Sequence, residues 1–258
     1  MSKILISGYY GFANAGDEAM LTAIIESLRQ VEKNVELTVL SGNPEDTAAK
    51  HQVCSVYRFN PLGIIRAMKD SELIISGGGS LLQDVTSKRS LLYYLSIIGL
   101  GKFFGKKVML FAQGIGPIRA KWARKLTSLV CNEADLITVR DSESAAELIE
   151  MGVKPEKITV TADSVLSLNP VTKECGQYLL QEAGVDLTKP VIGISVRPWS
   201  GDSQCFQVLA EAASKLQQSY GAQLILLPLQ YSVDVKACEK LRKALAVSYT
   251  HLTLPTKA

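Results

Sequence analysis

The chain has 258 residues, with 28 Lys and Arg against 25 Asp and Glu, a formal net charge of +3 and 47% apolar residues. This composition excludes a disordered chain, and the small net charge without a Lys/Arg cluster gives no reason to expect nucleic acid as a partner. The length exceeds a typical single domain of about 100–150 residues and is short for two complete ones.

Short β-branched runs alternate with helical patterns through the first part of the chain. We expect strands at Lys3–Ser7, Glu36–Leu40, Val53–Phe59, Leu73–Ser76, Lys107–Ala112, Leu136–Arg140 and Ile158–Thr161. We expect helices at Ala19–Gln30, Pro61–Lys69, Ser90–Phe104, Lys121–Glu133 and Ser142–Met151. Such alternation indicates parallel strands joined by crossover helices, so residues 1–170 are predicted to form a doubly wound, Rossmann-like α/β domain.

A change of pattern follows this domain. Residues 171–190 are predicted to be a linker, because turn-forming pairs at Asn169-Pro170 and Lys189-Pro190 flank one short helix at Lys173–Ala183. A partial second Rossmann-like domain is predicted over residues 191–246. Its expected strands are Val191–Val196 and Gln223–Leu227, and its expected helices are Cys205–Tyr220 and Val233–Ala246. Two strands are fewer than such a domain normally has.

The last twelve residues, 247–258, break the pattern again. They are rich in Thr and hold no acidic residue. We interpret them as a tail that is not native to the protein; a natural, poorly ordered tail is the alternative.

The cysteines and the N-terminus indicate the compartment. Five cysteines are scattered without a Cys-x-x-Cys pair, which is typical of reduced thiols in a cytosolic protein. No signal-peptide pattern precedes the first strand, and the longest apolar stretch, Leu91–Gly101, is below the ~18 residues that span a bilayer. We therefore expect a cytoplasmic protein without a transmembrane segment.

A glycine-rich segment, Gly8–Glu18, joins the first strand to the first helix. Its backbone N–H groups allow close approach of an anion or a sugar. Asp17 and Glu18 disfavour a phosphate on this helix, because two carboxylates already occupy its positive end. The spacing is not the Gly-x-Gly-x-x-Gly of dinucleotide sites. A tight turn with Asp17 as helix cap is the alternative interpretation.

Two further glycine-rich turns follow predicted strands. Gly77-Gly78-Gly79 ends one strand, and Gln83 and Asp84 come shortly after as candidate sugar or main-chain partners. Gln113-Gly114-x-Gly116-Pro117 repeats the arrangement one strand later. Because ligands of open α/β sheets bind at the carboxyl ends of the strands, we expect both turns to belong to a binding site.

Charged and polar residues end other strands. Arg140, followed by Asp141 and a predicted helix, suits a carboxylate or phosphate; an ion pair with Asp141 or Glu143 is the alternative. In the second domain, Arg197 and Gln230 occupy equivalent strand-end positions.

Metal and hydrolase signatures are missing from the sequence. The two histidines, His51 and His251, form no metal-ligand pattern, and neither a Gly-x-Ser-x-Gly elbow nor a Walker loop occurs. We therefore expect no metal site.

The order of these motifs resembles the polysaccharide pyruvyl transferase family, in particular the bacterial branch that modifies cell-wall polysaccharide precursors. The motifs are Gly8-x-x-Gly11-x-x-Asn14-x-Gly16-Asp17, the Gly77–Gly79 turn with Asp84, Gln113-Gly114-x-Gly116-Pro117 and Arg140-Asp141-x-x-Ser144. The resemblance implies a GT-B-like fold with two Rossmann-like domains. It also implies transfer of a carboxyethylidene (pyruvyl) group from phosphoenolpyruvate to two sugar hydroxyls, which forms a ketal and releases phosphate without a further cofactor.

The resemblance also suggests roles for the residues. Arg140 would contact an anionic group of phosphoenolpyruvate, whereas Asn14, Asp17 and Gly78 would line the acceptor side. Gly79, Asp84, Gln113, Arg197 and Gln230 complete the predicted substrate-binding set. The acceptor would be a lipid-linked or polymeric saccharide, which allows peripheral contact with the inner membrane face.

One departure from the family leaves the catalytic residues unassigned. The family carries an Arg-x-His motif late in its second domain, and this sequence has none. We therefore expect a truncated, poorly active family member. The alternatives are a GT-B glycosyltransferase that uses a nucleotide sugar and a non-catalytic sugar- or anion-binding module.

Overall fold

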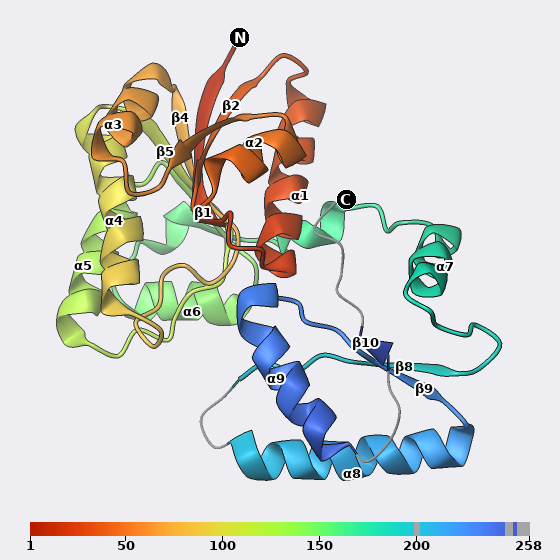
Figure 1. Ribbon diagram of the computed structural model, residues 1–258. Coiled ribbons are helices and arrows are strands. Elements are labelled where there is room, and N and C mark those ends of the chain that lie inside the picture. The colour runs from red at the N-terminus through yellow and green to blue at the C-terminus, as the bar shows by residue number, and fades with distance from the viewer. Residues whose placement is uncertain (199–201, 246–249, 252–258) are drawn as a thin grey trace. The chain divides into compact units, whose positions relative to one another are not determined.

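The computed structural model divides into two compact units (Figure 1). One comprises Met1–Phe12 and Gly16–Leu168, and the other comprises Ala13–Ala15 and Asn169–Ala258. The residues that the structure describes are 1–198, 202–245 and 250–251. The predicted tail at 247–258 therefore lies outside the described residues except for 250 and 251.

The first unit is built on a seven-stranded parallel sheet with the order β3-β2-β1-β4-β5-β6-β7. The chain leaves β1 for β2 on one side and later returns to place β4 on the other, so the order reverses between β1 and β4. The strands are β1 (Lys3–Tyr10), β2 (Glu36–Ser41), β3 (Cys54–Tyr57), β4 (Leu73–Gly77), β5 (Lys107–Gln113), β6 (Leu136–Val139) and β7 (Ile158–Val160). Such a reversal is where open α/β sheets bind ligands at the carboxyl ends of their strands.

Helices cover both faces of this sheet. They are α1 (Ala15–Val31), α2 (Pro44–His51), α3 (Pro61–Asp70), α4 (Lys88–Phe103), α5 (Lys121–Glu133) and α6 (Ser142–Glu150), with short 3-10 turns at Pro155–Lys157 and Ser164–Ser167. Alternate residues of β1 separate the two faces: Leu5 joins the core beneath α3, α4, α5 and α6, whereas Ile4 and Ile6 join the core beneath α1. This is the doubly wound arrangement predicted from the sequence.

Local sequence sets the helix starts. Asn43 and Asn60 cap α2 and α3, each accepting a backbone N–H three residues on, and a proline follows each cap at the first helical position. Helix α2 was not predicted from the sequence, because its eight residues bury only Thr47 and so show no apolar period.

The second unit holds a smaller parallel sheet with the order β10-β9-β8. Its elements are α7 (Lys173–Glu182), β8 (Val191–Ile194), α8 (Asp202–Tyr220), β9 (Gln223–Leu226), α9 (Tyr231–Ala244) and β10 (Thr250–His251). Leu224 and Leu226 of β9 are buried in one core with residues of α8 and α9.

The expectation of two strands in this second unit was wrong. Thr250 and His251, which we expected in a tail, pair in parallel with Ile225 and Leu226 of β9 and form a third strand. A pair of residues is too short to show an alternating pattern, so the sequence carried no signal for this strand.

Candidate functional site

The Gly77–Gly79 turn lies at the carboxyl end of β4, beside the first turn of α1. Gly78 and Gly79 have φ angles of +69° and +76°, a region that side chains with a Cβ adopt only at a cost. A Cβ at Gly79 would lie 3.2 Å from Asp17 Oδ1. The turn therefore brings a backbone free of side chains against the Asp17 carboxylate. The predicted contacts of Asp17 and Gly79 with substrate stay predictions.

Tyr10 fixes the start of this turn from β1. Its hydroxyl donates a 2.6 Å hydrogen bond to the carbonyl oxygen of Gly77, and the side chain is buried. Burial raises the pKa of the Tyr10 hydroxyl well above its usual value of 10.0, so it stays a proton donor throughout the physiological range. This residue was not predicted, although its place at the end of the first strand was a signal.

Gln113 ends β5 and ties it to β4. Its Nε2 donates to the carbonyl oxygen of Ser76 at 3.0 Å and to Ser76 Oγ at 2.8 Å. The side chain is fully buried, and its Oε1 has no hydrogen-bond partner among the described residues. Gln113 thus joins the carboxyl ends of β4 and β5, while its predicted contact with substrate stays a prediction.

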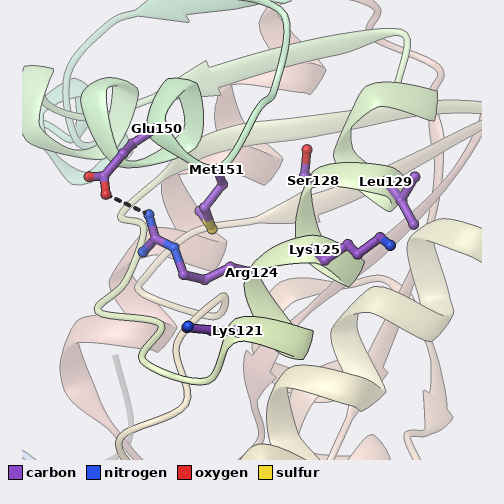
Figure 2. A pocket seen from close by; sticks show the side chains of 7 residues that line it. All are labelled: Lys121, Arg124, Lys125, Ser128, Leu129, Glu150 and Met151. Carbon is purple, nitrogen blue, oxygen red and sulfur yellow. Dashed lines mark ion pairs between the residues drawn. The ribbon is translucent and has the colours of Figure 1, made fainter.

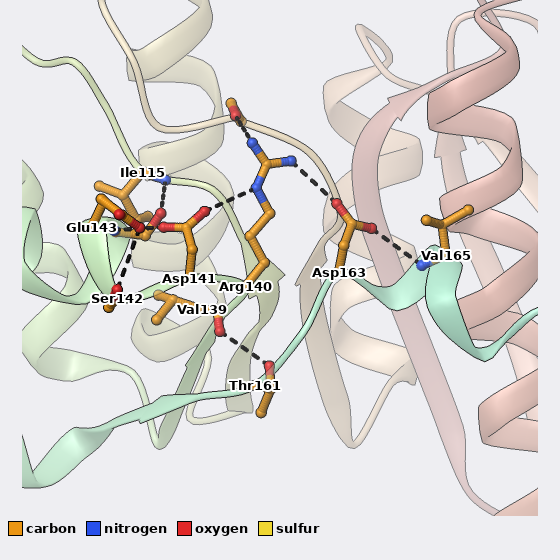
Figure 3. Close-up of polar contacts among 11 residues, drawn as sticks. Ile115, Val139, Arg140, Asp141, Ser142, Glu143, Thr161, Asp163 and Val165 are labelled. Atoms are coloured by element: carbon orange, nitrogen blue, oxygen red, sulfur yellow. Dashed lines mark hydrogen bonds and ion pairs between the residues drawn. The ribbon is translucent and has the colours of Figure 1, made fainter.

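Arg140 follows β6 and is held by side chains from three segments (Figure 3). Its Nε donates to Asp141 Oδ2 at 3.3 Å, its Nη1 to Asp163 Oδ2 at 3.2 Å and its Nη2 to Ser80 Oγ at 3.2 Å. The guanidinium also lies over Gly114, where an added Cβ would come within 2.8 Å of Arg140 Cζ. Glycine at 114 therefore makes room for the cation at the strand ends.

The surroundings of Arg140 combine both signs of charge. Hydrogen bonds from the side chain and backbone of Ser144 lower the pKa of Asp141, with Arg140 contributing, so that carboxylate is ionised at neutral pH. Three of the five N–H donors of the guanidinium are engaged with described residues, and the side chain is 34% exposed. The group is oriented by its neighbours and has donors left for an anion.

Asp84 holds the loop before α5. Its two carboxylate oxygens accept the backbone N–H groups of Arg119 and Ala120 at 2.9–3.0 Å. These backbone hydrogen bonds, with Arg119 first, lower the pKa of Asp84. The structure thus gives Asp84 a positioning role, and its predicted contact with substrate stays a prediction.

The predicted residues of the second unit also meet. Arg197 Nη2 donates to Gln230 Oε1 at 2.9 Å, and the backbone N–H of Gln230 donates to Asp234 Oδ2 at 2.7 Å. Gln230 and Asp234 are buried, 5% and 2% exposed. Asn14 precedes α1 in the short stretch that groups with this unit.

Sequence reasoning missed a buried cation, Arg58. It follows β3 and is 4% exposed, and its guanidinium carbon lies 4.4–6.0 Å from the centroids of five aromatic rings. Its Nη2 donates to Tyr94 Oη at 3.4 Å, whereas Nε and Nη1 have no hydrogen-bond partner among the described residues. Of the five rings, only Phe59 is next to Arg58 in the sequence and gave a local signal. Two other segments supply the remaining four rings.

The described part of the chain offers neither a metal site nor a membrane span. Among those residues, no group of three or more His, Cys, Asp or Glu side chains is placed to hold a metal ion. Nor does any helix in those residues have both the length and the apolar character needed to cross a membrane.

Comparison with known protein families gives a match over most of the chain. The family model for polysaccharide pyruvyl transferase matches residues 14–256. The chain belongs to the polysaccharide pyruvyl transferase family. The match confirms the family resemblance predicted from the sequence. The family is one of transferases, and its name implies a saccharide acceptor. The comparison with curated proteins gave no match.

Solved structures share the fold at low sequence identity. The Anabaena protein HepE in complex with UDP-glucose has a TM-score of 0.62 and 15% identity over 98% of this chain and 69% of its own. UDP-GlcNAc 2-epimerase of Neisseria meningitidis, bound to UDP-GlcNAc, has a TM-score of 0.61 and 12% identity over 100% and 73%. MnaA of S. aureus with UDP has a TM-score of 0.60 and 15% identity over 98% and 68%. These likenesses confirm the α/β, GT-B-like fold class.

Proposed function

We propose that this family member transfers a pyruvyl group from phosphoenolpyruvate to a sugar of a cell-wall or exopolysaccharide precursor. The match of the family model over residues 14–256 carries the proposal. In the reaction, the methylene carbon of the donor gains a proton and becomes a methyl group. Two sugar hydroxyl oxygens bond to the adjacent carbon, and the phosphate leaves with the second hydroxyl proton. The product is a cyclic ketal.

Arg140 is the residue we assign to the donor. The transition state places negative charge on the departing phosphate, and an oriented guanidinium stabilises such charge better than a mobile one. Asp141 and Asp163 supply the orientation through hydrogen bonds of 3.3 and 3.2 Å. Because these two carboxylates also reduce the local positive charge, a highly charged donor needs a second cation. Arg197 of the second unit stays a predicted substrate contact.

Asp17 and the glycines beside it are assigned to the acceptor. A turn without side chains at Gly78 and Gly79 next to a carboxylate leaves that carboxylate to accept from sugar hydroxyl groups. Asn14, Gln113 and Gln230 stay predicted substrate contacts. A lipid-linked acceptor would place the reaction at the cytoplasmic face of the membrane, with the protein bound there peripherally.

Binding calorimetry tests the proposal. Phosphoenolpyruvate and UDP-glucose are titrated separately into the protein, because the fold neighbours bind uridine nucleotides. We expect phosphoenolpyruvate to bind and inorganic phosphate to compete with it. Binding of UDP-glucose without binding of phosphoenolpyruvate would instead favour a nucleotide-sugar glycosyltransferase. Binding is the primary measurement since the sequence lacks the Arg-x-His motif.

A turnover assay complements the titration. Phosphoenolpyruvate is mixed with a lipid-linked acceptor that ends in a β-linked N-acetylmannosaminyl residue, and phosphate release is followed. Ketal formation with release of phosphate supports the proposed reaction. Donor binding with no ketal under any condition would point to a non-catalytic binding module.

A further inference from the structure

Charge is distributed unevenly along the first unit. Residues 85–132 contain nine Lys and Arg and not one Asp or Glu, although the whole chain has a net charge of only +3. This segment holds α4, β5, their connections and all of α5 except its last residue, the exposed Glu133. Helices α4 and α5 carry six of these nine cations and pack against each other on one face of the sheet (Figure 1).

The same two helices expose large apolar side chains. On α4, Leu92, Leu100 and Phe103 are 41%, 37% and 81% exposed. On α5, Trp122 and Leu129 are 47% and 59% exposed. The exposed residues are eight and three positions apart on α4 and seven positions apart on α5, spacings that return to the same face of a helix. Each set therefore forms a stripe on the side opposite the buried residues. Clustered apolar exposure of this kind marks a contact surface.

Cations border these stripes. Lys88 and Arg89 lie in the first turn of α4, and Lys121 and Lys125 lie on α5. None of the four forms an ion pair with another described residue, in contrast to Arg124, which pairs with Glu147 and Glu150 of α6. These four cations and the five apolar side chains together make up the α4–α5 surface.

Figure 2 shows the α5 part of this surface. Arg124 is turned towards Glu150 of α6, whereas Lys121, Lys125 and Leu129 lie along α5. The acidic residues of α6 thus neutralise one cation at the border and leave the others available.

We infer that the α4–α5 surface docks on an anionic phospholipid bilayer. Exposed aromatic and leucine side chains insert at the headgroup boundary, while Lys and Arg are attracted to the anionic lipids. This electrostatic attraction falls off within a Debye length, so it weakens as the salt concentration rises. Acidic residues are scarce on the two helices, Glu133 at the end of α5 being the one such residue among them, so a surface of this kind meets little repulsion from anionic lipids. This inference extends the peripheral contact proposed above by naming the residues that make it.

Vesicle sedimentation tests the inference without donor or acceptor, so its failure leaves the proposed transfer untouched. The protein is mixed with phosphatidylglycerol vesicles and with phosphatidylcholine vesicles at low and at high salt. We expect binding to the anionic vesicles that weakens with salt. The Lys121→Gln/Lys125→Gln double variant should bind about 30-fold more weakly.

A control removes the same charge elsewhere. Lys33→Gln/Lys173→Gln changes two exposed lysines outside the α4–α5 surface and should bind within about twofold of the unmodified protein. Phe103→Ser/Trp122→Ser, which alters exposed side chains only, should lose binding while unfolding at the same temperature. No binding to anionic vesicles, or equal loss in the control and the test variants, would overturn the inference. Binding to an acidic polymer such as heparin without binding to vesicles would overturn it as well.

Discussion

Gly79→Ala tests whether the turn beside Asp17 needs a residue without a side chain. Gly79 has a φ of +76°, and this left-handed backbone costs a residue with a Cβ about 1–2 kcal/mol. For a unit of roughly 150–250 residues, we expect this to lower the melting temperature by about 2–8 °C. The new methyl group would also lie 3.2 Å from Asp17 Oδ1, so the carboxylate must move by a few tenths of an ångström.

Two matched glycines separate these effects. Gly105 has a φ of +69° but no atom within 4 Å of an added Cβ, so Gly105→Ala should lower the melting temperature without moving a site residue. Gly99 lies in α4 with open space and no positive φ, so Gly99→Ala should raise stability by about 0.5–1 kcal/mol.

Thermal unfolding by circular dichroism and calorimetric titration with the acceptor give the readouts. Both Gly79→Ala and Gly105→Ala should unfold earlier, and only Gly79→Ala should weaken acceptor binding. The reasoning is refuted if Gly79→Ala is as stable as Gly99→Ala, or if it binds acceptor as the unmodified protein does.

Two further predictions concern the groups that hold the site. Hydrogen bonds from the backbone N–H groups of Arg119 and Ala120 lower the pKa of Asp84 below its usual 3.8. The ionised carboxylate therefore stabilises the fold above pH 3.8. This stabilisation is lost as the pH falls through the lowered pKa. Urea unfolding should therefore show Asp84→Asn less stable than the unmodified protein at pH 7 and nearly equal to it at the lowest accessible pH; an equal gap at both would contradict the assignment. Tyr10→Phe removes the 2.6 Å hydrogen bond to the Gly77 carbonyl and should cost about 1–2 kcal/mol in the same unfolding experiment, whereas an unchanged midpoint would show that the bond contributes nothing.

Much of the first unit could be predicted because its segments carry local signals. Apolar β-branched runs gave all seven strands of its sheet, and cap residues such as Asp141 fixed helix starts. Helix α2 was not predicted because it buries only Thr47 and so shows no apolar period. Strand β10 was not predicted because two residues are too few to show alternation.

The site was predictable only where one segment determines it. The strand-end position of Arg140 was visible in the sequence, and Asp141 was weighed as its ion-pair partner. The contact with Ser80 joins residues sixty positions apart and depends on the strand order, which no local pattern encodes. The aromatic surroundings of Arg58 likewise come from three separate segments, so the buried cation became visible only in the folded chain.

Calorimetric titration of phosphoenolpyruvate into the Arg140→Gln variant tests the central claim most directly. The claim is that Arg140 holds an anionic group of the donor, and a charge-assisted hydrogen bond of this kind accounts for about 1.5–3 kcal/mol. Arg119→Gln serves as the control, because it also removes one cation while Asp84 keeps its contact with the backbone N–H of residue 119. We predict that the unmodified protein and Arg119→Gln bind phosphoenolpyruvate alike and that Arg140→Gln binds it about 10- to 150-fold more weakly. Equal binding by Arg140→Gln would contradict the account.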